Sequence, residues 1–208
     1  MNELSTLALA AALAWASGIR LYAVIFLVGL AGRQQWVVLP EHLKVLSHLY
    51  VIVASGCMLV LEFFADKIPA IDSIWDAVHT VIRIPAGALL AAGVIGVEDG
   101  AAWAVVAGLL GGTITAGTHF TKAGSRALIN TSPEPVTNWA ASFTEDALIL
   151  GGLWLAFAHP VVFLVLLGIF ILLMIWLLPK LWRFIKKLVS RLFGLLGLAQ
   201  PAAQSAKS

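Results

Sequence analysis

The sequence has few charged residues. Asp, Glu, Lys and Arg make up 12% of the 208 residues, whereas hydrophobic residues make up 61% and the mean hydropathy is +0.96. A soluble domain needs more charge to cover its surface, so this composition excludes that class and predicts an integral membrane protein. At about 20 residues per span, the length allows about six transmembrane helices.

The sequence also lacks the motifs of the common catalytic and metal sites. Cys57 is the only cysteine, which excludes an intrachain disulfide and a metal site built from thiolates. There is no HExxH pair, no Gly-Xaa-Ser-Xaa-Gly elbow and no phosphate-binding loop. Metal chemistry would have to use scattered histidines such as His48, His79, His119 and His159. We therefore predict no enzymatic activity, no cofactor, no metal and no nucleic-acid partner, with a membrane enzyme as the alternative.

Hydrophobic segments alternate with short polar turns along residues 1–179, which predicts one all-α transmembrane domain. The helices are expected at residues 5–31, 40–65, 73–95, 101–129, 136–158 and 161–178. Pro85 is expected to kink or split the third helix, and Pro179 is expected to end the sixth.

The two halves of this domain, residues 1–97 and 98–179, resemble two versions of one three-helix unit. The Gly-Ile-Arg run that ends at Arg20 is similar to the Gly-Ser-Arg run that ends at Arg126. An odd number of crossings per unit would give the units inverted topology, which is the plan of many transporters and channels. The repeat is a hypothesis, because the identity between the halves is low.

The C-terminal end of the chain has basic residues and no acidic ones. Residues 180–208 hold six basic residues, whereas the rest of the chain holds seven basic residues against eleven acidic ones. Over residues 180–198, apolar residues at helical spacing predict a basic amphipathic helix on anionic lipids of the cytoplasmic leaflet. The residues predicted to face that surface are Lys180, Arg183, Lys186, Lys187 and Arg191. Residues 199–208 are expected to be disordered.

This basic segment predicts a cytoplasmic C-terminus in a bacterial inner membrane. With six crossings, the N-terminus is expected on the same side, as is the turn at residues 130–135. The expected partners are the lipid bilayer, anionic lipids at the C-terminal helix and an unidentified small solute. Faces rich in small residues leave homo-oligomerisation open as a further expectation.

Residues 111–146 bring many polar side chains into an otherwise apolar chain. A Pro-containing turn separates two sets of three polar residues. Before the turn, the spacing i, i+3, i+7 relates His119, Lys122 and Arg126; after it, the spacing i, i+4, i+7 relates Asn138, Ser142 and Glu145. Because that turn should make the two helices antiparallel neighbours, their cationic and anionic faces are expected to meet. The predicted solute-binding residues are Arg20, His119, Lys122, Arg126, Asn138, Ser142, Glu145 and Asp146.

A second polar stripe lies on the expected third helix, where Asp76, His79 and Arg83 are spaced i, i+3, i+7. Asp76 and His79 are expected to hydrogen-bond to each other. A charge at the centre of a membrane helix costs about 2.5–3.5 kcal/mol on the insertion scale, so these residues should find partners. With Glu62 from the preceding helix, they form the predicted partner cluster of Glu62, Asp76, His79 and Arg83.

Two runs of the sequence resemble a known family. They are FFADKIPAIDSIWDAVHTVIR at residues 63–83 and TKAGSRALINTSPEPVTNW at residues 121–139, the latter followed by TED at residues 144–146. Both are similar to the bacterial membrane proteins grouped as the domain-of-unknown-function 4126 family, and the resemblance covers about residues 1–178. It implies a small multi-span helical membrane protein, and it implies no reaction.

The buried charges favour a small membrane transporter or channel for an anionic or amphiphilic solute. Arg20, Lys122 and Arg126 would attract the solute, while Glu145 and Asp146 would balance charge or carry a proton. The alternative is a structural or partner-binding membrane protein in which the same residues form stabilising ion pairs.

Overall fold

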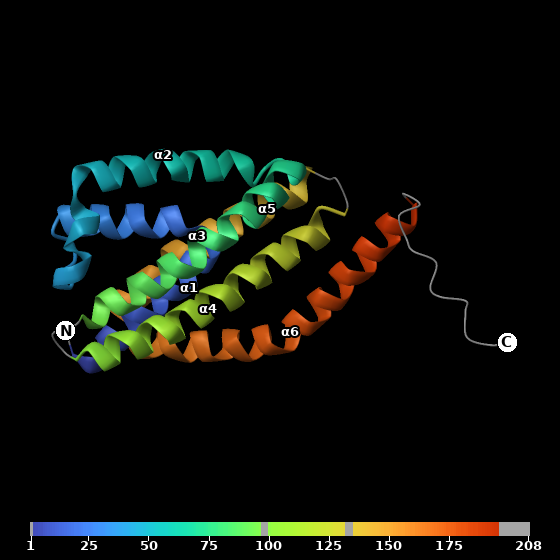
Figure 1. The fold of residues 1–208 in the computed structure, drawn as a ribbon. Coiled ribbons are helices and arrows are strands. Elements are labelled where there is room, and N and C mark those ends of the chain that lie inside the picture. The colour runs from blue at the N-terminus through green and yellow to red at the C-terminus, as the bar shows by residue number, and fades with distance from the viewer. Residues whose placement is uncertain (1, 97–99, 132–134, 196–208) are drawn as a thin grey trace.

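The computed structural model describes residues 2–96, 100–131 and 135–195, and the described chain is helical, without strands (Figure 1). Its elements are α1 (Glu3–Arg33), the 3-10 helix η1 (Glu41–Ser47), α2 (Leu49–Ala65), α3 (Pro69–Ile95), α4 (Ala101–Ile129), α5 (Pro135–Ala158) and α6 (Pro160–Leu195). By length and composition, five helices among the described residues could cross a membrane, namely α1, α3, α4, α5 and α6, and η1 with α2 would form a further span bent by 66°. The prediction of an all-α membrane protein is therefore confirmed.

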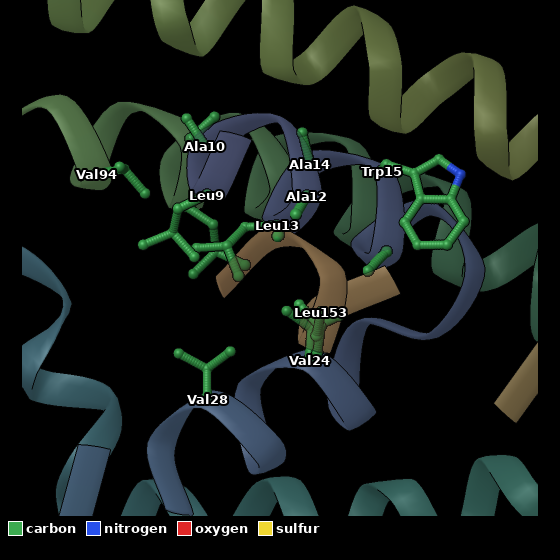
Figure 2. Packing of buried hydrophobic residues seen from close by; sticks show 14 of the residues in the cluster. Leu9, Ala10, Ala12, Leu13, Ala14, Trp15, Val24, Val28, Val94 and Leu153 are labelled. Atoms are coloured by element: carbon green, nitrogen blue, oxygen red, sulfur yellow. The ribbon is translucent and has the colours of Figure 1, made fainter. Parts of the chain in front are cut away.

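The first helix, α1, turns back on itself inside the bundle. Arg20 has extended backbone angles (φ −145°, ψ 89°) within an otherwise helical segment. Figure 2 shows the chain reversing direction between Trp15 and Val24, so that the helical arms before and after Arg20, residues 3–19 and residues 21–33, run in opposite directions. The prediction of one continuous first span is therefore wrong.

Each arm of α1 packs against a different part of the bundle. The carbonyl of Ala14 in the first arm accepts a 2.8 Å hydrogen bond from the Thr115 hydroxyl of α4. Gly18, near the reversal, lies so close to α4 that a Cβ there would be 2.6 Å from the Thr115 carbonyl oxygen. In the second arm, Gly29 packs against Ile52 at the start of α2. Glycine at position 18 thus allows the arm to end against α4.

The reversal changes the relation between the two ends of the chain. Because α1 begins and ends at the same end of the bundle, the helices that run from end to end are α2 to α6 (Figure 1). The start of α1 therefore lies at the end of the bundle opposite to the end of α6. The start of α1 and the end of α6 therefore do not lie together, as six crossings would place them, while the side of the membrane on which each lies stays a prediction.

An apolar core surrounds α1. Leu9, Leu13 and Val24 are completely buried, and Figure 2 shows them pointing toward the neighbouring helices. They belong to a cluster that also contains Val94 of α3 and Leu153 of α5. The arms of α1 are thus the centre of the bundle, around which the other helices pack.

Helices α3 and α4 form the most extensively packed pair of the bundle. Gly87 of α3 lies directly against Thr115 of α4, and Gly111 of α4 lies directly against Ala91 of α3. Small residues at these crossing points let the two backbones approach closely, as is usual for helices packed in a membrane.

Prolines do not interrupt the helices where the sequence suggests. α3 begins at Pro69 rather than near residue 73 and continues through Pro85 without a break. α6 likewise includes Pro179 and continues to Leu195, changing direction along its length (Figure 1). The expected separate helix at residues 180–198 is therefore the continuation of α6, and residues 196–208 lie outside the described residues.

The directions of the helices bear on the hypothetical repeat. The second arm of α1, then α2 and α3, run opposite to α4, α5 and α6 respectively (Figure 1). Inverted units would have this property. The first arm of α1 has no counterpart among the described residues after position 100, so the repeat stays a prediction.

Candidate functional site

The charged residues expected in two separate groups form one buried network. It lies toward the end of the bundle where α2 leads into α3 and where α4 ends, because Asp66 in the α2–α3 connection contacts side chains from α1 and α4. Its most deeply buried members, each at most 7% exposed, are Arg20, Glu62, Asp66, Asp76, Arg83, Lys122 and Arg126.

Arg20 sits at the reversal of α1 and joins it to two other elements. Its Nη2 lies 2.8 Å from Oδ2 of Asp66, and its Nε lies 2.9 Å from Oδ1 of Asp146 in α5. Nη2 also donates a 2.7 Å hydrogen bond to the hydroxyl of Ser142. The break in α1 is therefore held in place by ion pairs to the α2–α3 connection and to α5.

Asp66 is a central member of the network that the sequence analysis missed. Its Oδ2 lies 2.8 Å from Arg20, 3.5 Å from Lys122 and 3.7 Å from Arg126. In the sequence, Asp66 follows Glu62 at spacing i+4, which places both carboxylates on one helical face. That spacing within an apolar segment could have identified it.

Arg83 of α3 is the second centre of pairing. It forms ion pairs with Glu62 of α2 and with Asp76, whose Oδ1 lies 2.8 Å from Nη1. The same Nη1 donates a 3.2 Å hydrogen bond to Nδ1 of His119, whose Nε2 is 2.7 Å from the hydroxyl of Thr80. His119 thus accepts from Arg83, which links the stripe on α3 to that on α4.

His79 does not bond to Asp76, so that expectation is wrong. Its Nδ1 lies 2.8 Å from the carbonyl oxygen of Trp75, and its Nε2 lies 3.1 Å from the hydroxyl of Tyr22. Both ring nitrogens therefore have other partners, and His79 connects α3 to the second arm of α1.

The cationic face of α4 and the anionic face of α5 meet as expected. Arg126 binds Glu145 with two hydrogen bonds, from Nε to Oε1 (2.8 Å) and from Nη2 to Oε2 (3.1 Å). Its Nη1 donates to the side-chain oxygen of Asn138 (3.2 Å). Lys122 lies 3.5 Å from Glu145 and donates a 3.1 Å bond to the carbonyl of Ile19. The structure thus brings these residues together, while their role in binding a solute stays a prediction.

Asp72, in the first turn of α3, is buried without a cation within 4 Å among the described residues. The side-chain amide of Asn130 donates a 3.0 Å hydrogen bond to its Oδ2. This pair continues the polar contacts between α3 and α4 toward the end of the bundle.

The network is not fully satisfied by protein atoms. Buried carboxylate oxygens that lack a hydrogen-bond partner within the described ranges are Oε2 of Glu62, Oδ1 of Asp66, Oδ1 of Asp72 and Oδ2 of Asp76. A buried polar atom without a partner costs about 1–3 kcal/mol. Water or protons would therefore stabilise these oxygens.

A pocket of about 330 Å³ reaches the network between α4 and α5. Lys122, Arg126 and Glu145 line its polar side. Thr118 lines it too, and within the part of the chain that the structure describes its buried hydroxyl has no partner. Phe170 of α6 contributes to the apolar side of the pocket.

On the other side of α5, a pocket of about 500 Å³ is lined almost wholly by apolar side chains, including Phe26 and Phe63. Its one charged lining residue among those described is Asp146. The adjacent carboxylates of α5 thus face two different pockets, and Arg20 contacts both of them.

The described residues contain no group of three or more His, Cys, Asp and Glu side chains placed to hold a metal ion. The carboxylates of the network instead face guanidinium and ammonium groups.

The basic residues expected at the membrane surface lie on the last part of α6. Lys180, Arg183, Lys186 and Lys187 are exposed. The ammonium group of Lys180 lies 2.9 Å from the ring centre of Trp176, a cation–π contact. The side chain of Arg191 lies outside the described residues.

The model of the domain-of-unknown-function family DUF4126 matches residues 7–180, so the chain belongs to this family. The resemblance noted from the sequence is thereby confirmed. No curated protein and no solved structure matches the chain. Membership and the apolar helices together support a multi-pass membrane protein.

Proposed function

We propose that the chain is a small membrane transporter or channel for an anionic or amphiphilic solute, with the buried network as its polar site. The reversal of α1 at Arg20 is the observation that carries this proposal. Interrupted membrane helices place backbone groups and charges at a solute site in many transporters. Here Lys122 donates to the carbonyl of Ile19, the residue before the break, so the broken helix end is part of the network.

The incomplete hydrogen bonding of the network also supports a binding role. Buried polar groups in a purely structural network are normally satisfied, because each missing bond destabilises the fold. The unpartnered oxygens of Glu62, Asp66 and Asp76 can accept hydrogen bonds from water or take up protons, as a hydrated site would provide. In this proposal Arg20, Lys122 and Arg126 attract the solute.

The alternative is that the ion pairs hold the bundle together and bind no solute. It is favoured by the observation that Arg20, Arg83, Lys122 and Arg126 each contact at least one carboxylate. Removing one partner of a buried ion pair destabilises a protein by about 3–5 kcal/mol.

Purified protein in liposomes separates the two functions. We would measure proton flux with an entrapped pH dye, and flux of small anions, for the wild type, Lys122→Met and Lys44→Met. Lys44 is the matched control because it is 60% exposed and pairs with Glu41 outside the network. The transporter proposal expects flux that is lost in folded Lys122→Met and kept in Lys44→Met. Absence of wild-type flux, together with a lower yield and melting temperature of Lys122→Met, would support the structural alternative.

The proposal places the protein in a bacterial inner membrane with the end of α6 in the cytoplasm, because the exposed basic residues there suit the anionic leaflet. The start of α1 would then lie on the opposite side of the membrane. Each basic residue near the surface contributes about 1 kcal/mol of attraction to anionic lipid. The proposal includes no enzymatic reaction and no cofactor.

A further inference from the structure

We propose that Glu145 occupies the place of a small carboxylate solute, and that the solute displaces it as Glu145 takes up one proton. The inference rests on the proposed function, since it names the solute class and the coupled ion of the same site. Its starting point is the environment of the Glu145 carboxylate, which resembles that of a bound ligand.

Glu145 is held by cations from two helices. Arg126 binds both of its oxygens, at 2.8 and 3.1 Å, in the two-pronged geometry by which arginine recognises carboxylates. Lys122 lies 3.5 Å from Oε2 and Arg20 lies 3.7 Å from it. A carboxylate solute in the same position would therefore meet a complete set of donors.

Exposure distinguishes Glu145 from Asp66, which contacts the same three cations. The side chain of Asp66 is 0% exposed and lies at the end of α2, inside the bundle, whereas that of Glu145 is 13% exposed. Glu145 also lines the pocket of about 330 Å³ between α4 and α5. A solute entering this pocket meets Glu145 first, so Glu145 is the carboxylate that it can replace.

The pocket suits a carboxylate with a short apolar chain. Beside the cations, Thr118 also lines the pocket. Ile129, Leu148 and Phe170 line the rest of the pocket and would contact the apolar chain. The combination favours a small amphiphilic anion over an inorganic ion.

Charge balance makes the displacement depend on a proton. An ionised Glu145 and an anionic solute would repel each other beside the same cations, and Asp66 and Asp146 add further negative charge nearby. If Glu145 binds a proton as it leaves Arg126 and Lys122, the incoming carboxylate restores the original charge. One proton therefore accompanies each monocarboxylate.

The inference can be tested by calorimetric titration of the purified full-length chain with butyrate. The titrations are made between about pH 6 and 8, where simple carboxylates stay ionised. Binding that takes up one proton weakens tenfold for each pH unit. We expect this slope in the wild type and in the exposed control Glu41→Gln. Glu145→Gln should bind butyrate at least tenfold more tightly at pH 8, without the slope. Asp146→Asn should retain the slope, because Asp146 lines the other pocket.

Three results would overturn the inference. The wild-type affinity for butyrate could be independent of pH, the pH dependence of the affinity could persist in Glu145→Gln, or every folded variant could fail to bind butyrate. If Glu145→Gln fails to fold, Glu145→Asp replaces it: its shorter side chain should compete less, so binding no tighter than in the wild type overturns the inference. Liposome flux distinguishes this failure from that of the proposed function. Proton-linked binding without any flux overturns transport and supports the role of Glu145. Flux without proton-linked binding supports transport and overturns the role of Glu145.

Discussion

The two ends of the α3–α4 pair are held together by different physical means. Toward the end near Asp72, charged and polar side chains pair across the helices, as in the 3.7 Å contact of Asp76 with Lys122. Farther along, Gly87 lies against Thr115 with no space for a larger side chain. The same helix pair therefore contains a part that depends on charge and a part that depends on close backbone approach.

This difference shows where stability and function can be separated. Close packing of small residues needs no solvation change and suits a permanent contact in lipid. Ion pairs can exchange partners with a solute or with protons, so the charged part can rearrange while the packed part stays fixed. The predictions below test this division, and each is read from the melting temperature in detergent by the intrinsic fluorescence of the eight tryptophans.

The largest loss of stability is expected from Arg83→Met, which removes a cation from the charged part of the α3–α4 pair. Arg83 is fully buried, so its loss leaves Glu62 and Asp76 without their guanidinium partner. Leaving a buried charge uncompensated destabilises a protein by about 3–5 kcal/mol. The matched control is Arg183→Met, because Arg183 is exposed on α6. Equal melting temperatures for the two variants would contradict the importance of this pairing.

The next largest loss of stability is expected from Gly87→Ala, which disturbs the closely packed part of the α3–α4 pair. The new methyl group would clash with Thr115, and that side chain cannot move freely because its hydroxyl bonds the carbonyls of Ala14 and Gly111, both at 2.8 Å. Overpacking of this kind costs about 1–3 kcal/mol.

Gly151→Ala is the matched control for Gly87→Ala. Gly151 lies inside α5 with nothing within 4 Å of an added Cβ, so alanine should stabilise the helix by up to about 1 kcal/mol. A loss of stability in Gly151→Ala as large as that in Gly87→Ala would show that the close contact at Thr115 does not matter.

Much of this architecture follows from the sequence, for identifiable reasons. Apolar segments and their spacing predict the helices α3 to α6, and helical periodicity places Lys122, Arg126 and Glu145 on facing sides. Local patterns such as these depend on residues close together in the chain. The resemblance to the family likewise depends on two contiguous runs of sequence.

What the sequence did not show depends on contacts between distant segments. The turn at Arg20 interrupts a uniformly apolar helix, and it is stabilised by Asp66 and Asp146, which lie far along the chain. Asp66 was missed because an Asp-Lys pair before a proline also marks the end of a helix. Pro179 was expected to end a helix and Pro85 to kink or split one, whereas both helices continue through these prolines, which membrane helices tolerate.

The smallest effect is expected from Asp72→Asn, and it sharpens the comparison within the charged part. Asparagine keeps an oxygen that can accept from Asn130 and removes a buried charge that has no cation within 4 Å among the described residues. The melting temperature should therefore stay near that of the wild type or rise. Asp76→Asn changes the same atoms one turn later but weakens the 2.8 Å contact with Arg83, so it should lose about 1.5–3 kcal/mol, as for hydrogen bonds to charged groups. Equal losses in the two variants would mean that burial of the carboxylate, rather than its pairing with a cation, determines stability here.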